Sequence, residues 1–77
     1  MRVAIRTFGN LRQFLPEHAQ GAPLIVPDNV PISQLLAQLG IPENEAWRVS
    51  RNGILVQLDD VLSEGDEVNV FAPVGGG

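Results

Sequence analysis

The chain has 77 residues and no cysteine, and its nine acidic residues against five basic ones give a formal net charge of −4. A chain of this length forms one small domain, and without cysteine it has no disulfide, thiol nucleophile or thiolate metal ligand. Its charge disfavours nucleic acid, which requires a dense basic face, and favours a partner whose docking surface is positive.

Other exclusions follow from single residue types and from hydropathy. No apolar run approaches the roughly 20 residues of a membrane span, and Met1 is not followed by a secretory pattern. The lone histidine, His18, does not make a metal site without carboxylates at ligand spacing. We therefore expect a cytoplasmic protein that binds no membrane, no nucleic acid and no metal. All five basic residues are arginine, so the chain offers no lysine for attachment of its own C-terminus.

The first strand is predicted at residues 2–8, where apolar and polar side chains alternate as in a half-buried strand. Gly9 and Asn10 end it. We expect residues 11–22 to form a loop with one short helical turn. Residues 24–26 then predict a short strand, whose flanking prolines suit a free edge.

A helix is predicted at residues 31–39. Pro31 suits the first helical position, and Gly40 suits the residue just beyond the C-terminus. Four apolar residues recur at helical spacing and form one face: Ile32, Leu35, Leu36 and Leu39.

The second half of the chain predicts three strands. Asn52-Gly53 is a strong hairpin signal, because a type I′ turn requires positive φ at both positions. It joins strands expected at residues 47–51 and 54–58. Turn-forming residues follow, in which acidic side chains cap backbone groups, and the last strand is predicted at residues 67–71.

This order of elements predicts an α+β domain at residues 1–72, with one main helix covering a mixed sheet of four to five strands. If the first strand pairs with the last in the middle of the sheet, the fold is a β-grasp. The expected core consists of Val3, Ile5, Val26, Ile32, Leu35, Leu36, Leu39, Val49, Val56, Leu62, Val68 and Val70.

Residues 73–77 predict a flexible C-terminal Gly-Gly tail that folding alone does not explain. Pro73 stops the last strand, and three glycines then bury no side chain and lose the most entropy if ordered. The carboxylate of Gly77 at the end of so slim an arm is suited to enter a narrow active site on another protein. The alternatives are a floppy terminus and a cloning remnant.

Strand alternation places three large apolar side chains on the face that the helix leaves uncovered: Phe8, Leu55 and Phe71. The prediction for Leu55 assumes that Ile54 and Val56 face the helix. Exposed apolar patches usually mark interfaces, and aromatic side chains often anchor them, although single exposed apolar residues are common.

Three further residues receive weaker assignments. Arg6 and Arg12 are expected to flank the aromatic side chains, where surface arginines usually contribute little. Trp47 is expected in the core or at its rim.

The chain as a whole resembles the ubiquitin-like β-grasp sulfur carriers of the MoaD/ThiS type. The residues that carry the resemblance are 3–12 (VAIRTFGNLR), 32–42 (ISQLLAQLGIP), Asn52-Gly53, Leu62 with 65–68 (GDEV), and 71–77 (FAPVGGG). Phe8, Leu11, Arg12, Phe71 and Pro73 make it closest to the small subunit of molybdopterin synthase. It departs from that subunit at Ala72, where the subunit often has a second proline, and at Gly75, which makes three terminal glycines in place of two.

The resemblance implies that an E1-like adenylating enzyme activates Gly77 with ATP and that Gly77 becomes a thiocarboxylate. This group would donate sulfur in molybdenum cofactor (molybdopterin) biosynthesis. It implies no bound cofactor and no catalytic residue in this chain, which would be the small non-catalytic subunit beside a large catalytic subunit or an equivalent sulfur acceptor. The implied tail residues in the partner's active site are Val74, Gly75, Gly76 and Gly77, and the implied partner-binding residues are Phe8, Leu55, Phe71 and Pro73.

Three alternatives remain open from the sequence. The first is a sulfur carrier for another pathway, such as thiamine thiazole, cysteine or tRNA thiolation. The second is a ubiquitin-like modifier that forms isopeptide bonds. The third is an interaction domain with an incidental tail.

Overall fold

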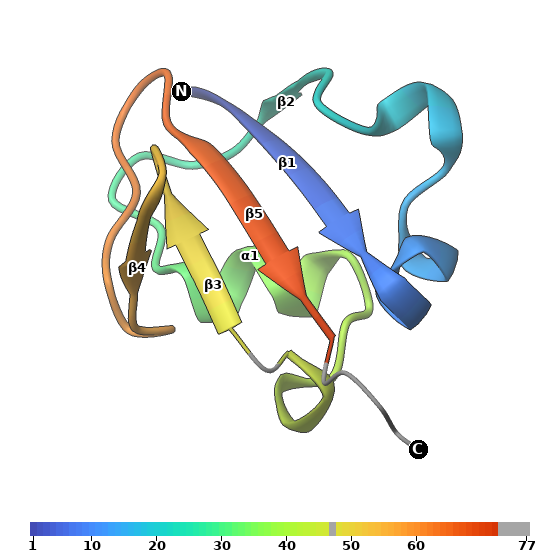
Figure 1. Ribbon diagram of the computed structural model, residues 1–77. Coiled ribbons are helices and arrows are strands. Elements are labelled where there is room, and N and C mark those ends of the chain that lie inside the picture. Colours follow the sequence, from blue (N-terminus) through green and yellow to red (C-terminus); the bar gives the residue numbers. More distant parts are fainter. Residues whose placement is uncertain (47, 73–77) are drawn as a thin grey trace.

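The computed structural model describes residues 1–46 and 48–72, which form one sheet with an α-helix on one of its faces (Figure 1). The elements are β1 (Arg2–Phe8), η1 (Gly9–Phe14), η2 (Glu17–Ala19), β2 (Pro23–Ile25), α1 (Ile32–Gln38), η3 (Glu43–Glu45), β3 (Arg48–Arg51), β4 (Ile54–Val56) and β5 (Glu67–Phe71), where η marks a 3₁₀ helix. No helix in these two ranges is long and apolar enough to cross a membrane.

The sheet has five strands in the order β2-β1-β5-β3-β4. Its two central strands, β1 and β5, run parallel, with Ile5 opposite Val68 and Phe8 opposite Phe71. The other neighbouring strands are antiparallel. The predicted α+β β-grasp fold is therefore confirmed, including the pairing of the first strand with the last.

Helix α1 begins after Pro31, which stands just outside the helix and forms a bridge with Val61. The prediction that Pro31 is the first helical residue is wrong by one position. The first amides of the helix need acceptors from elsewhere in the chain, and Ile32 N donates to Asp60 O at 2.9 Å while Ser33 N donates to Leu58 O at 2.8 Å. Gly40 has φ of +79° beyond the helix, as predicted.

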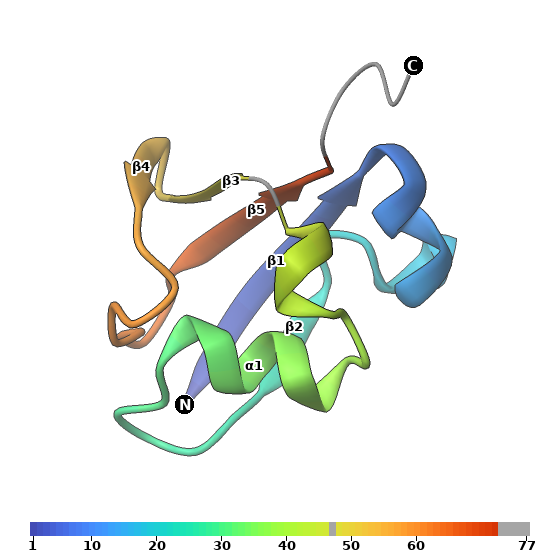
Figure 2. The same cartoon turned by 90° about the horizontal axis from the view of Figure 1, so that it is seen from below.

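The core lies between α1 and the inner face of the sheet, which Figure 2 shows from below. Ten of the twelve predicted core residues are buried, whereas Leu39 and Val56 are only partly buried. Four buried apolar residues were not predicted: Leu11, Leu15, Val30 and Ile41. Leu11 belongs to η1 and Leu15 follows it, and an irregular 3₁₀ segment has no regular apolar period from which burial can be read.

The segment at residues 11–22 contains more structure than the single turn expected. It holds most of η1 and all of η2, and the side chain of Gln20 joins it to the sheet. Strand β2 pairs only with residues 2–4 of β1, so the amide of Thr7 has no strand partner on that side. Gln20 fills this position, because Thr7 N donates to Gln20 Oε1 at 2.9 Å and Gln20 Nε2 donates to Thr7 Oγ1 at 2.7 Å.

The hairpin prediction is confirmed at its turn, and one apolar side chain on the inner side of the hairpin is uncovered. Asn52 and Gly53 have φ of +53° and +86°, as a type I′ turn requires. Ile54, however, is 69% exposed and does not pack in the core. Ile54 lies on the outermost strand, β4, and pairs with Arg51 of β3 next to the hairpin turn. Strand alternation predicts the face to which a side chain points, but not whether another element covers that face.

The strand bounds also differ from the predictions by small amounts. The second strand lies one residue earlier than expected, and β4 ends at Val56 rather than at Leu58. Strand β3 begins at Arg48, and the prediction for Trp47 falls outside the described residues.

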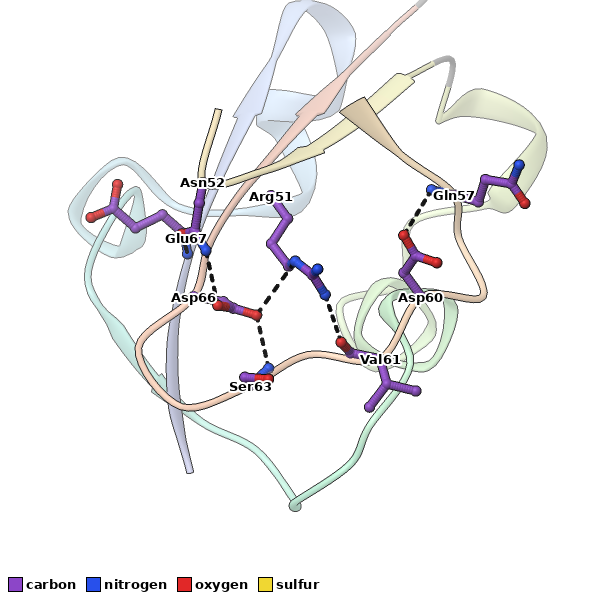
Figure 3. A network of polar contacts seen from close by, with 8 residues as sticks. All are labelled: Arg51, Asn52, Gln57, Asp60, Val61, Ser63, Asp66 and Glu67. Carbon is purple, nitrogen blue, oxygen red and sulfur yellow. Dashed lines mark hydrogen bonds and ion pairs between the residues drawn. The ribbon is translucent and has the colours of Figure 1, made fainter. Parts of the chain in front are cut away.

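Asp66 joins the hairpin turn to the start of β5 (Figure 3). Its carboxylate accepts from Ser63 N at 2.8 Å and from Asn52 Nδ2 at 3.0 Å, and it lies 3.8 Å from Arg51 Nε. Asn52 also accepts from Glu67 N at 2.9 Å. Asp66 thus has the capping role expected of an acidic side chain in this turn. It is buried, and its carboxylate joins the hairpin, the turn at Ser63 and the start of β5.

Removal of the Asp66 carboxylate should destabilise the fold. Asp66→Ala leaves the Ser63 amide and the Asn52 side chain without their acceptor, and we expect the free energy of unfolding in urea to fall by about 2 kcal/mol. The exposed Asp59 provides the control, and Asp59→Ala should change the same quantity by less than about 0.5 kcal/mol. Equal effects of the two substitutions would contradict this role for Asp66.

Candidate functional site

The candidate site begins where β5 ends, at the base of the C-terminal arm. Phe71 is the last residue of β5 and lies opposite Phe8, the last residue of β1. Their rings are stacked, with centroids 4.8 Å apart and an interplanar angle of 14°. Phe8 is 37% exposed and Phe71 is half-buried. The structure therefore brings these two predicted site residues together on the outer face of the sheet.

Gly9 and Ala72, which follow Phe8 and Phe71, also lie close together. Gly9 has φ of +66°, and a Cβ placed on it would lie 3.2 Å from the Cβ of Ala72. Ala72 itself packs against the core. The last two described residues before the arm, Phe71 and Ala72, are thus held by Phe8 and Gly9. The sequence predicts only a strand-ending role for Gly9, although a glycine directly after a strand is a signal for close approach of another segment.

The end of β1 that carries this contact is itself fixed on its other side. Thr7, directly before Phe8, is bonded through its amide and hydroxyl to Gln20, whose Nε2 also donates to Leu15 O at 3.2 Å. Thr7 is 1% exposed, and a buried amide without a partner is costly. The Gln20 side chain therefore stabilises the strand end against which the arm begins.

Leu55 lies on the same face but not beside the two aromatic rings. It is 56% exposed and pairs with Ser50, which in turn pairs with Asn69 of β5. Two polar residues thus separate Leu55 from Phe71 along the sheet. The three residues predicted as one patch form a stacked pair and a separate leucine.

The remaining predicted site residues, Pro73, Val74, Gly75, Gly76 and Gly77, lie outside the described residues. What the structure places is the point at which they begin, after Ala72 at the end of a central strand. His18 is exposed in η2. Within residues 1–46 and 48–72, no group of three or more His, Asp or Glu side chains is placed to hold a metal ion.

The fold and this site define a ubiquitin-like β-grasp protein whose C-terminal segment begins beside a stacked aromatic pair. The family model described as the ThiS family matches residues 5–77. The chain belongs to the ThiS family and is a sulfur carrier of the MoaD/ThiS type. Among curated proteins no sequence match is found.

Solved structures support the fold. SAMP1 from Haloferax volcanii has a TM-score of 0.72 at 21% identity, covering 100% of both chains. A putative molybdopterin converting factor, subunit 1, from Pyrococcus furiosus has a TM-score of 0.68 at 22% identity, covering 96% of this chain and 99% of that one. A thiamine biosynthesis protein from Geobacter metallireducens has a TM-score of 0.59 at 18% identity, covering 100% of this chain and 88% of that one.

The close approach of Gly9 to Ala72 can be measured. Gly9→Ala imposes positive φ on a residue with a Cβ, which costs about 1–2 kcal/mol, and also brings this Cβ against Ala72. Gly53→Ala is the matched control, because Gly53 has φ of +86° and nothing within 4 Å of its added Cβ. We expect a larger loss of unfolding free energy for Gly9→Ala than for Gly53→Ala.

A second substitution, Ala72→Gly, distinguishes the contact between residues 9 and 72 from the backbone strain at residue 9. It should recover part of the loss in Gly9→Ala, with a coupling energy of about 0.5–1 kcal/mol, and recover none of the loss in Gly53→Ala. Additive effects in both double variants would show that Gly9 does not act on the base of the arm.

Proposed function

We propose that this chain is the sulfur carrier for molybdopterin biosynthesis and the small, non-catalytic subunit of molybdopterin synthase. Gly77 is the residue that reacts. A separate E1-like enzyme adenylates its carboxylate with ATP, and a large catalytic subunit receives the arm. Because activation consumes ATP, we place the reaction in the cytoplasm.

The proposed chemistry proceeds in three steps outside the folded body. A carboxylate oxygen of Gly77 attacks the α-phosphorus of ATP and pyrophosphate leaves, which gives an acyl-adenylate. A persulfide sulfur on a partner then attacks the acyl carbon and AMP leaves, because AMP is a far better leaving group than the oxide of a free carboxylate. A thiol finally cleaves the acyl disulfide and leaves a C-terminal thiocarboxylate, whose sulfur is the group transferred.

The observation that carries the proposal is the stacked pair Phe8–Phe71 with Gly9 against Ala72 at the start of the arm. A reactant that must enter another protein's active site needs a fixed base and a slim tip. The central position of β5 and these two contacts supply the base. Residues 74–77, one valine and three glycines, supply a tip that a narrow channel admits.

The residues around Phe8 and Phe71 suit a chain that is a reactant and not a catalyst. The residues next to the aromatic pair in register are Asn69, Arg6 and Arg48. None of these side chains serves as a general base near neutral pH, since arginine does not lose its proton in proteins. The partners therefore supply acid–base groups and the nucleotide site.

The choice of molybdopterin over other sulfur acceptors rests on sequence context. Phe8 with Leu11 and Arg12, and Phe71 with Pro73, match the small synthase subunit, and the Pyrococcus furiosus structure with this fold is a putative molybdopterin converting factor subunit. The second candidate is a carrier for thiamine thiazole formation, which the fold of the Geobacter metallireducens protein favours.

Mass spectrometry tests the proposed reaction. After incubation with its activating enzyme, ATP and a persulfide donor, the C-terminal peptide should gain about 16 Da, the difference between oxygen and sulfur. Omission of ATP provides the control and should leave the mass unchanged. A peptide of unchanged mass in the complete reaction, with an enzyme shown to be active on another carrier, would reject the proposal.

Substitution of the aromatic pair tests the docking surface. Phe71→Ala should raise KM for activation by about tenfold or more, because truncation of a buried aromatic anchor typically costs at least 2 kcal/mol of binding. Ile54→Ala is the control, because Ile54 is 69% exposed and points to the other face. Urea unfolding of both variants must show a folded chain. Equal KM values for Phe71→Ala and wild type would remove the aromatic pair from the docking surface.

A further inference from the structure

Among the strand residues of the sheet's outer face, arginines outnumber acidic residues, although the chain as a whole is acidic. By strand register, three arginines point to this face from the strands, Arg2, Arg6 and Arg48, and one acidic strand residue, Glu67, does so. The net charge of −4 therefore resides elsewhere. The charged strand residues nearest to Phe8 and Phe71 are Arg6 and Arg48, whereas the net charge of the chain favours a positive partner surface.

Arg6 is the arginine whose placement points to a specific contact. It precedes Phe8 by two residues on β1 and thus lies on the same face, opposite Asn69. A Cβ placed on Gly21 would lie 2.6 Å from Nη2, 2.7 Å from Cζ and 3.0 Å from Nε of Arg6. The guanidinium group therefore lies directly over the backbone of Gly21, in space that any other residue would fill.

Gly21 is itself fixed against the sheet. Its amide donates to Ile5 O at 2.8 Å, and its φ is +75°. The Arg6 head thus lies against the backbone of Gly21, beside its own strand.

The Arg6 guanidinium has no partner among the residues that the structure describes. Arg12 bonds Glu17 at 2.8 Å, and Arg51 bonds Val61 O at 2.8 Å. The Arg6 guanidinium forms neither a hydrogen bond nor an ion pair with any residue of the described ranges, and Glu67, which lines the same small hollow, is not within ion-pair distance of it. Its planar fork of donors matches the two oxygens of a carboxylate.

We propose that Arg6 binds a carboxylate side chain of the partner enzyme, next to an apolar surface of that enzyme that covers Phe8 and Phe71. The proposal rests on the proposed function, because it assumes that the partner is the enzyme that activates this chain. Arginine and aromatic residues are the side chains most often responsible for affinity at protein interfaces. A second copy of the chain is a poor occupant, because a symmetric pairing of this face would bring like charges together.

The experiment is the kinetics of activation by an E1-like enzyme that adenylates the wild-type chain. Arg6→Gln should raise KM about tenfold and leave kcat unchanged, because a desolvated ion pair is lost on binding while Gly77 is untouched. Raising the salt concentration should raise KM for wild type more than for Arg6→Gln. Arg6→Lys keeps the charge but not the fork, and its KM should lie between the two.

Arg2→Gln is the matched control. It removes the same charge from the same strand and face, about 13 Å further along β1, and should change KM by less than about twofold. A positive partner surface predicts the opposite sign, namely a lower KM for Arg6→Gln, and this result or an unchanged KM would overturn the proposal.

Two further outcomes are distinguishable. If no E1-like enzyme adenylates the wild-type chain, the proposed function fails and this inference fails with it. If wild type is adenylated but Arg6→Gln behaves like Arg2→Gln, the inference alone fails. A wild-type dimer in sedimentation that Phe71→Ala dissociates would assign the face to a second copy and would also overturn it.

Discussion

The parallel pairing of β1 with β5 is the constraint on which the rest of the structure depends. It places the C-terminal strand in the middle of the sheet, between β1 and β3. A central strand has ladder hydrogen bonds on both sides and side chains that pack in the core, as Val68 and Val70 do. Phe71, directly before the last described residue, is therefore paired on both sides, with Phe8 and with Arg48. A small core without cysteine is stabilised here by the central position of the C-terminal strand and not by disulfides.

Several features of the fold were predictable because single residues report them directly. Gly40 and Asn52-Gly53 require positive φ, and the alternation of β1 and β5 identifies the inner face. The stacked pair Phe8–Phe71 also followed from alternation once the two strands were paired. The buried Leu11 and Leu15, and the exposed Ile54, were not predictable in this way. Their burial depends on which segment covers them, and that is decided by tertiary contacts such as the bonds from Gln20 to Thr7.

The candidate site shows a similar division. Its aromatic residues carry a sequence signal, whereas the roles of Gly9 and Gly21 depend on what lies against them, Ala72 and Arg6 respectively. The net charge of the chain also does not report the charge of a single face, because strand register directs three of the five arginines to one side of the sheet.

The central claim is that a rigid body presents a slim arm whose final carboxylate is activated by a partner. The most direct measurement compares the wild-type chain with a variant extended by one leucine after Gly77, using pyrophosphate release by the activating enzyme and urea unfolding of each protein. The account predicts that the extended variant unfolds like wild type and releases no pyrophosphate, because the added side chain widens the tip and displaces the reacting group. Pyrophosphate release at the wild-type rate would contradict it.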